Sequence, residues 1–343
     1  FPNILNYNRL NANTMVPQQD LNKAAQQEGL SPKDQGLALL WGNFNTWDKT
    51  ANKRNGVLKR WRKLVLIFII AGAFTGLLSG NLAALEGMYF HYASQGLAFL
   101  STLFVALASY AGSEILTDDL EKAQIKARAA AESYKSEAFL YIFKAPPYDK
   151  RPEEIIYDRV NRIEEVTADV TREPMQKQEE LKGLPNPEMT IDDYVDERIE
   201  DQIYNYFTQK IQGLQRKQKR GKNITLFFGF AGVILGALSS TGLGFAQHTA
   251  SWIAFVTSAS AAITSFMATN RYQYLISSYQ ATSTRLKTLL TKWKQVPEKD
   301  AEAARHFVLD VETELSRENQ AWVEELSKKI DKDLAQVAKN QQE

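Results

Sequence analysis

Four stretches of the chain are apolar and carry no charged residue. They are Leu64–Ser79, Ala93–Gly112, Ile224–Ala246 and Trp252–Thr269. Stretches of this length without ionisable side chains are typical of helices that cross a lipid bilayer. The alternative is four buried helices of a soluble bundle, but such helices usually show a polar face. The pattern therefore predicts an all-α, polytopic membrane protein with four transmembrane helices.

The polar remainder of the chain is predicted to form further helices. The expected helices are Leu116–Lys144, Glu153–Lys182, Ile191–Gln218, Tyr272–Gln295 and Glu298–Val337. Proline and glycine residues end several of them, and no alternating pattern of the kind that predicts strands appears. In the last helix, Val308, Val311 and Leu315 begin an apolar stripe that must pack on another helix. We expect these segments to form a large cytoplasmic domain.

Positive charge is distributed asymmetrically around the apolar stretches. Basic residues precede the first and third stretches: Lys49, Lys53, Arg54, Lys59, Arg60, Arg62, Lys63, Lys210, Arg216, Lys217, Lys219, Arg220 and Lys222. The linkers Asn81–Tyr92 and Gln247–Ser251 contain neither Lys nor Arg. Because positive charge stays on the cytoplasmic side of short loops, the pattern predicts two hairpins with both termini in the cytoplasm. The basic residues either set this topology alone, the simpler interpretation, or also bind anionic lipid headgroups.

The two hairpins are copies of one unit. When Lys59–Gly80 is aligned with Lys219–Ser240, nine of the 22 positions are identical without a gap. Both copies have the same orientation by the charge rule, unlike the inverted repeats of many transporters. We therefore divide the chain into a polar N-terminal arm (1–35), a first hairpin repeat (36–185) and a second hairpin repeat (186–343), each repeat with its cytoplasmic helices.

Small residues recur every four positions in the first helix of each hairpin. They are Gly72, Gly76 and Gly80, and at the equivalent positions Gly232, Gly236 and Ser240. Small residues at this spacing line one face of a helix and let another backbone approach closely. We predict that this face is the packing seam of each hairpin or of neighbouring subunits.

The second helix of each hairpin carries a weakly polar stripe. Its candidate pore-lining residues are Ser101, Thr102, Ser109, Ser258, Ser265 and Thr269, with Glu114 and Asn270 at the inner mouth. Such a stripe can line an aqueous path when hairpins assemble in a ring. Alternatively, the hydroxyl groups form hydrogen bonds between packed helices.

Composition excludes several chemistries. The chain has 41 Lys and Arg against 40 Asp and Glu, no Cys and three His. This balance argues against nucleic-acid binding, and the lack of Cys excludes thiol catalysis and Cys-based metal sites. The apolar stretches lack the ionisable groups that ion-coupled transporters place in the membrane, and no phosphate-binding loop is present. We expect no enzymatic activity, no cofactor and no metal.

One segment resembles a known family. Ala127–Asp149 presents a spaced Arg, Glu and Lys, then Glu, an aromatic residue and a Pro-Tyr stop, at Arg128, Glu132, Lys135, Glu137, Tyr141 and Pro147-Tyr148. This pattern resembles the bacterial membrane proteins of the DUF4231 family, which are related to the SLATT group of two-transmembrane domains. A looser copy follows in Tyr279–Trp293 and Phe307–Trp322, where Lys287 and Trp293 match but Gln280 and Thr284 replace the Arg and Glu. The resemblance covers roughly residues 40–335 as two tandem copies.

The resemblance implies that the domains oligomerise into pores or membrane-disrupting effectors. We expect no attached nucleotidyltransferase or sensor domain, a departure from the conflict-system arrangement of the SLATT group that argues against the effector interpretation. From the weakly polar stripes, we expect an oligomeric integral membrane protein that forms a weakly selective pore. The alternative is a membrane-anchored scaffold whose cytoplasmic helices bind a protein partner. The expected partners are membrane lipid and further copies of the chain, and the expected location is the bacterial inner membrane, or a thylakoid if the source is cyanobacterial.

Overall fold

The computed structural model describes residues 32–176, 179, 181–241, 246–297 and 300–317. Within this described part every regular element is a helix. In chain order the elements are α2 (Pro32–Ala83), α3 (Met88–Tyr110), η1 (Ala111–Ile115), α4 (Asp118–Ile142), α5 (Pro152–Val166), α7 (Ile191–Tyr194), η2 (Val195–Phe207), α8 (Thr208–Ser239), α9 (Ala246–Thr269) and α10 (Tyr272–Lys294). Residues 301–317 are also helical. The all-α prediction is confirmed for this part of the chain.

Two long helices each join a polar half to an apolar half. Helix α2 has 52 residues, which corresponds to a length of about 78 Å. It begins at Pro32, a position in the first turn where proline costs no hydrogen bond. In the second repeat, α7, η2 and α8 follow one another without a break from Ile191 to Ser239. The polar and apolar segments that the sequence pattern separates are therefore continuous rods.

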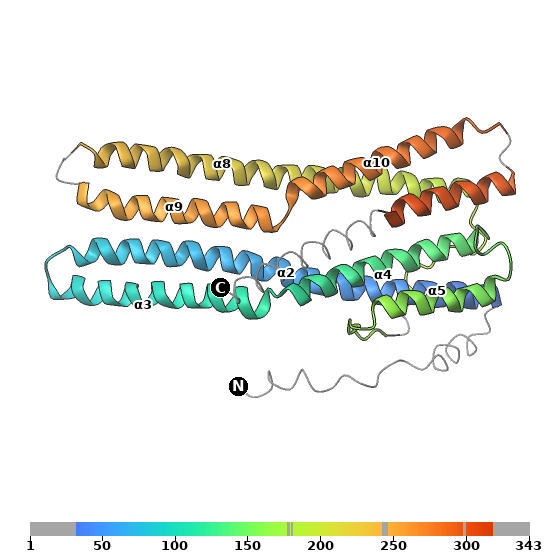
Figure 1. Cartoon of the computed structure of the whole chain (residues 1–343), viewed down its shortest axis with the longest axis horizontal. Helices are drawn as coiled ribbons and strands as arrows, with labels where there is room; N and C mark the ends of the chain where they lie inside the picture. The colour runs from blue at the N-terminus through green and yellow to red at the C-terminus, as the bar shows by residue number, and fades with distance from the viewer. Residues whose placement is uncertain (1–31, 177–178, 180, 242–245, 298–299, 318–343) are drawn as a thin grey trace, which may run out of the picture.

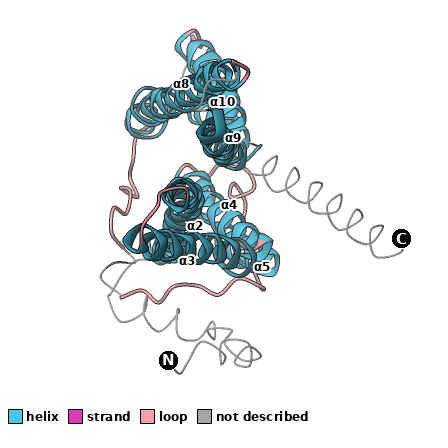
Figure 2. Cartoon of the chain, turned by 90° about the vertical axis from the view of Figure 1, so that its left-hand side faces the viewer, coloured by secondary structure: helices cyan, strands magenta, loops and turns pink. Residues whose placement is uncertain are grey.

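The four apolar segments lie side by side at one end of the molecule. Helix α2 packs against α3 and α9, and α9 packs against α8. Figure 1 shows the resulting order α8, α9, α2, α3, with both pairs pointing the same way, and Figure 2 shows the same pairs from the end. The two middle helices thus come from different repeats. This arrangement leaves α3 and α8 at the outside.

The buried core lies at the opposite end, outside the apolar segments. Its members come from the first half of α2, α4, α5, η2, α10 and residues 301–317, and include Trp47, Tyr134, Ile199, Leu286 and Val308. The apolar segments contribute little to it. In the most apolar windows of the four candidate spans, only 17%, 11%, 0% and 22% of the residues are buried. Because soluble proteins rarely leave such large apolar surfaces exposed, the four helices, long and apolar enough to cross a bilayer, indicate membrane association.

One predicted helix is wrong in its length. The expected helix Glu153–Lys182 ends at Val166 in the structure. The following residues run along α2 and form hydrogen bonds with it in both directions: Arg54 donates to the Thr171 carbonyl oxygen at 2.8 Å, and the Glu173 amide donates to Thr50 Oγ1 at 2.9 Å. These bonds with side chains of α2 replace the hydrogen bonds that a continued helix would make within itself. The polar arm at residues 1–31 and the predicted helix beyond residue 317 lie outside the described residues.

Candidate functional site

Helix α4 is the central element of the body outside the apolar segments. Ala127, Ala130, Ala131 and Ala138 are buried along it, and such small side chains allow neighbouring helices to come close. Thr117 caps its first turn by accepting a hydrogen bond from the Leu120 amide at 3.4 Å. The larger polar side chains of α4 therefore reach directly into contacts with α2, η2 and residues 301–317.

A buried ion pair joins η2 to the helix at 301–317. Arg198 donates from Nε to Glu312 Oε1 at 3.0 Å and from Nη2 to Oε2 at 2.9 Å. Only 2% of the Arg198 side chain and 1% of the Glu312 side chain are exposed. Ser136 of α4 and Tyr194 of α7 also donate to the Glu312 carboxylate, at 2.6 and 2.8 Å. We call these four residues the clasp, because they hold the first repeat (Ser136) to the second.

The clasp depends on an unusual helix. Residues Val195–Phe207 form 13 residues of π-helix, whereas most π-helical segments are single turns at functional sites. Val195, Ile199, Ile203 and Phe207 recur every four residues on its buried face. A spacing of four residues is close to one helical turn, so these apolar side chains share one face of the helix. The same face carries Arg198 into the core.

A second charged group lies beside the clasp. Arg128 pairs with Glu132 on α4 and with Asp48 of α2 at 2.7 Å, and Lys135 lies 5.4 Å from the centre of the Phe44 ring. Burial opposes the charge of Glu132, but Arg128, Arg198 and Lys135 together hold its pKa below the usual value. Burial, followed by the charge of Arg198, lowers the pKa of Lys135 to about 8. Three of the residues that carry the family resemblance, Arg128, Glu132 and Lys135, are thus brought together in one charged cluster.

The lowered pKa of Lys135 predicts that the stability of the protein depends on pH. Its folded pKa of about 8 lies below the ordinary value of 10.5, so the unfolded chain binds more protons between these pH values. Burial of the charged lysine destabilises the folded protein fully below pH 8, and this destabilisation disappears as the pH rises from 8 to 10.5. We expect the Lys135→Met variant to unfold at a higher temperature than the wild type at pH 7. The difference should shrink between pH 8 and 10.5 when thermal unfolding is followed by tryptophan fluorescence.

The matched control for this prediction is Lys122→Met, which changes a more exposed lysine of the same helix. A Lys135→Met variant that is less stable than the wild type at pH 7 would show that the contacts of Lys135 with Glu132 and Glu312 outweigh its burial.

The end of α4 is closed by a third polar contact. The Tyr148 hydroxyl donates to Glu137 Oε2 at 2.8 Å, and Arg159 Nε of α5 lies 3.6 Å from Glu137 Oε1. Burial raises the pKa of Glu137, while Arg159 opposes this effect. The Pro-Tyr stop of the family pattern therefore places Tyr148 against its own helix. This contact is structural, because Tyr148 is fully buried.

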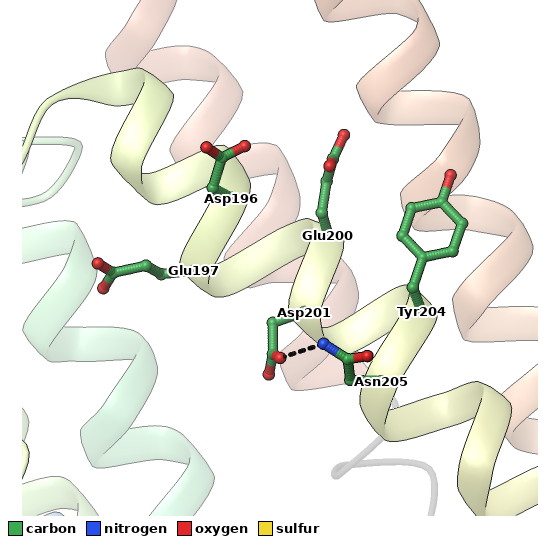
Figure 3. Close-up of a pocket in the computed structure, with 6 residues that line it drawn as sticks. All are labelled: Asp196, Glu197, Glu200, Asp201, Tyr204 and Asn205. Carbon is green, nitrogen blue, oxygen red and sulfur yellow. Dashed lines mark hydrogen bonds between the residues drawn. The ribbon is translucent and has the colours of Figure 1, made fainter.

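Two hollows adjoin η2. One, of about 460 Å³, includes Trp41, Lys135, Phe139, Met189 and Arg198 in its wall. The other is a shallow acidic groove of about 630 Å³ lined by Asp196, Glu197, Glu200, Asp201, Tyr204 and Asn205. Figure 3 shows that its carboxylates point in different directions, and Asp201 accepts a hydrogen bond from Asn205 at 2.8 Å. Among the described residues no group of three or more His, Asp or Glu side chains is arranged to hold a metal ion.

The glycines of the predicted seam differ between the two repeats. A Cβ atom added at Gly72 would lie 3.2 Å from Val105 and 3.4 Å from the Ser101 carbonyl oxygen, and one at Gly76 would lie 3.0 Å from Ser101 Oγ. Gly80 faces α9, with Ser251 Oγ at 3.9 Å. In the second repeat the contacts are looser: Gly232 lies near Val256 at 3.7 Å.

The last two positions of the seam lack a close neighbour on another helix. Gly236 has no neighbour within 4 Å of an added Cβ. Ser240 is exposed, and its hydroxyl donates to the Ala237 carbonyl oxygen of its own helix at 2.7 Å. The close approach therefore occurs between α2 and α3.

The candidate pore-lining residues also separate into two groups. Ser101 Oγ donates to the Gly72 carbonyl oxygen of α2 at 2.8 Å and so takes part in helix packing. The others are exposed on the surface of the chain: Thr102, Ser109, Ser258, Ser265 and Thr269. Glu114 is exposed, whereas Asn270 donates to the Phe266 carbonyl oxygen of its own helix at 2.7 Å. No hydrogen bond joins Glu114 to Asn270 within the described residues.

Sequence reasoning missed a polar contact between α2 and α3. Ser79 Oγ donates to the Ser94 carbonyl oxygen at 2.8 Å, and Ser94 Oγ donates to the Ser79 carbonyl oxygen at 3.0 Å. Both serines are buried. Interhelical bonds of this type stabilise helix pairs in lipid. A serine in each helix of the pair was the only signal available in the sequence.

These features define a membrane-associated helical protein made of two tandem units, each with two apolar helices and a charged helical extension. Comparison with protein families agrees. Residues 45–155 match the family described as Protein of unknown function (DUF4231), and residues 194–322 match the SMODS and SLOG-associating 2TM effector domain 1 (SLATT_1). The first unit is therefore similar to DUF4231 domains, and the second unit is similar to SLATT_1 domains.

The tandem arrangement predicted from the sequence is confirmed, but the second unit matches SLATT_1 rather than a second copy of DUF4231. Comparisons with curated proteins and with solved structures find no match.

Proposed function

We propose that the chain is an integral membrane protein that assembles into homo-oligomers and acts as a weakly selective pore. The apolar segments form two hairpins in the membrane, and the charged helical body with both termini lies in the cytoplasm, at the inner membrane of a bacterium. The match to a 2TM effector domain supports a role at the membrane. The basic stretches of α2 and α8 support the orientation, since each directly precedes the apolar half of its helix.

One observation carries the pore proposal. Ser258, Ser265 and Thr269 of α9 are exposed and are separated by seven and four residues, so they share one helix face. A single chain has its four apolar segments side by side, in the order α3, α2, α9, α8, and does not surround this face. Several copies are therefore needed to enclose a path. Thr102 and Ser109 of α3, also seven residues apart and exposed, add a second polar face.

The pore proposal predicts a conductance that depends on the α9 face. The full chain, reconstituted in planar bilayers, should conduct ions. Replacing both Ser258 and Ser265 with Leu should lower the single-channel conductance severalfold, because two leucines per subunit narrow and dry the path. The matched control is Thr257→Leu with Thr264→Leu, which makes the same change on the adjacent face of α9, where both threonines are exposed.

The alternative function is a membrane-anchored scaffold. The large buried core outside the apolar segments favours it, because a minimal pore needs little such mass. A sealed oligomer without conductance, in protein shown to be inserted, would favour the scaffold. A strictly monomeric protein in detergent would contradict the pore.

A further inference from the structure

The hollow of about 460 Å³ beside the clasp lies where the two repeats meet. It is lined by Trp41 and Lys135 of the first repeat and by Met189 and Arg198 of the second. Ligand pockets have volumes of about 300–1,000 Å³ and combine apolar walls with a few charged groups. The hollow has both properties, and its walls belong to the charged helical body rather than to the apolar segments.

Arg198 brings an unused hydrogen-bond donor to this hollow. Its Nε and Nη2 atoms donate to the Glu312 carboxylate, whereas Nη1 is buried and has no hydrogen-bond partner within the described residues. Because the guanidinium group is planar and its Nε–Nη2 edge faces Glu312, Nη1 is turned away from Glu312, which does not line the hollow. A buried charged donor without an acceptor is unfavourable, so an anionic acceptor that binds here gains affinity.

Lys135 supplies a second cation to the same wall. Its ammonium group lies 5.4 Å from the centre of the Phe44 ring and forms no ion pair within the described residues. Burial, followed by the charge of Arg198, lowers the pKa of Lys135 to about 8, so the lysine is still charged at pH 7. A carboxylate that contacts both cations forms charge-assisted hydrogen bonds, which a neutral group cannot match.

Apolar side chains make up much of the remaining wall. The rings of Trp41 and Phe139 meet edge to face, with their centroids 6.3 Å apart, and both residues are buried. The Arg198 guanidinium lies 5.1 Å from the centre of the Phe139 ring, so the apolar surface adjoins the cation. A ligand with an apolar group next to its anionic group fits this wall. Three further apolar residues line the hollow: Leu184, Pro185 and Met189.

The loop at residues 183–189, which forms one side of the hollow, is fixed to α2. Trp41 Nε1 and Asn45 Nδ2 both donate to the Lys182 carbonyl oxygen, each at 3.0 Å. These two bonds hold the start of the loop in place. The apolar side of the hollow is therefore formed in advance, which reduces the entropy that a ligand loses on binding.

Carboxylates complete the wall of the hollow: Asp193, Glu197 and Asp201. All three residues are exposed, whereas Arg198 is buried, so the negative charge lies on the solvent side of the hollow. Asp193 and Asp201 already accept hydrogen bonds from neighbouring side chains, but Glu197 forms no hydrogen bond or ion pair within the described residues. Figure 3 shows Glu197 pointing to a different side of η2 from Glu200. A ligand with one negative and one positive group fits this division of charge better than a simple anion does.

We propose that this hollow binds a small zwitterion of the amino-acid type with an apolar side chain. The ligand carboxylate pairs with Arg198, at Nη1, and with Lys135, and the ligand ammonium group pairs with Glu197. The apolar side chain packs on Trp41 and Phe139. Because the site uses groups from both repeats, a bound ligand stabilises their contact beside the clasp. The site lies outside the apolar segments and does not depend on the pore proposal.

The test compares three probes that differ by one charged group. They are L-phenylalanine, 3-phenylpropionate, which lacks the amino group, and phenethylamine, which lacks the carboxylate. Binding of each probe to the full chain in detergent is measured by isothermal titration calorimetry at pH 7. Because each analogue loses one charge-assisted contact, we expect it to bind about tenfold or more weakly than L-phenylalanine does.

Two charge variants assign the contacts. Lys135→Met should weaken the binding of L-phenylalanine and 3-phenylpropionate about tenfold without weakening that of phenethylamine. Glu197→Gln should weaken the binding of L-phenylalanine and phenethylamine without weakening that of 3-phenylpropionate. The matched controls are Lys122→Met on α4 and Asp196→Asn on η2, which remove the same charges outside the wall of the hollow and should bind all three probes as the wild type does.

Three results would overturn the proposal. If neither L-phenylalanine nor L-leucine binds at millimolar concentration, the hollow is not a site for this class of ligand. If L-phenylalanine binds the wild type and both charge variants equally, it binds elsewhere on the chain. If 3-phenylpropionate binds as tightly as L-phenylalanine, the hollow takes a simple carboxylate and the role of Glu197 is wrong. None of these results bears on the pore, which is tested by conductance in bilayers.

Discussion

Replacing Glu312 with alanine is expected to destabilise the protein by about 3–5 kcal/mol. The change removes the carboxylate but leaves Arg198 in the core, and a buried charge without its partner costs this much. Ser136 and Tyr194 lose their acceptor at the same time. The loss should appear as a large drop in the thermal unfolding midpoint of purified protein in detergent, followed by tryptophan fluorescence.

Two further variants separate charge from packing at the clasp. Glu179→Gln breaks the exposed ion pair between Lys49 and Glu179 and serves as the comparison for a surface pair. Because both side chains are about half exposed, this variant should change the free energy of unfolding by no more than about 0.5 kcal/mol. The double variant Arg198→Met/Glu312→Leu replaces the buried pair with apolar groups and should recover most of the stability that Glu312→Ala loses. If Glu312→Ala unfolds at the wild-type temperature, the buried pair does not form in the protein.

Replacing Gly72 with leucine is expected to force α2 away from α3. Even a single added Cβ atom at this position lies 3.2–3.4 Å from Val105, Phe104 and the Ser101 carbonyl oxygen, which is closer than most such contacts. Overpacking of this kind costs about 1–3 kcal/mol, and the displacement also breaks the bond from Ser101 to the Gly72 carbonyl. The unfolding midpoint should fall, and cross-links between cysteines introduced on α2 and α3 should become slower.

The second repeat supplies the matched control. Gly236→Leu changes the position equivalent to Gly76, in a helix where nothing lies within 4 Å of an added Cβ. We expect this variant to unfold at the wild-type temperature as a single chain. If Gly236 forms a seam between subunits, Gly236→Leu should lower the oligomer size on size-exclusion chromatography with light scattering, whereas an unchanged size would place the subunit contact elsewhere.

The helix seam shows how far a repeated pattern can be interpreted. The spacing of Gly72 and Gly76 predicts a face that another backbone can approach, and the structure places Ser101 of α3 on that face. The same spacing at Gly232 and Gly236 has looser neighbours. Small residues only permit close approach, so the sequence cannot tell which helix, in the same chain or in another, makes use of it.

The sequence indicates the clasp less clearly than it indicates the glycine seam. Glu312 stands one position after Val311 and four after Val308, so a carboxylate falls on the apolar stripe that was predicted to pack on another helix. A charged residue on such a stripe indicates a buried partner. The partner itself, Arg198, could not be chosen among 41 basic residues, because the pair joins positions 114 apart. The π-helix that carries Arg198 was predicted as an ordinary helix.

The amino-acid sequence alone determined the properties that depend on local spacing: four apolar segments, the helical class, the duplication, the basic flanks and the family pattern on α4. Each follows from which residues recur along one helix, so no knowledge of distant contacts is needed. The tertiary structure decided which helices lie together: α9 lies beside α2, and Glu312 of the second repeat lies against Ser136 of the first. These contacts join segments more than a hundred residues apart, and their choice depends on the packing of whole surfaces, which no local pattern records.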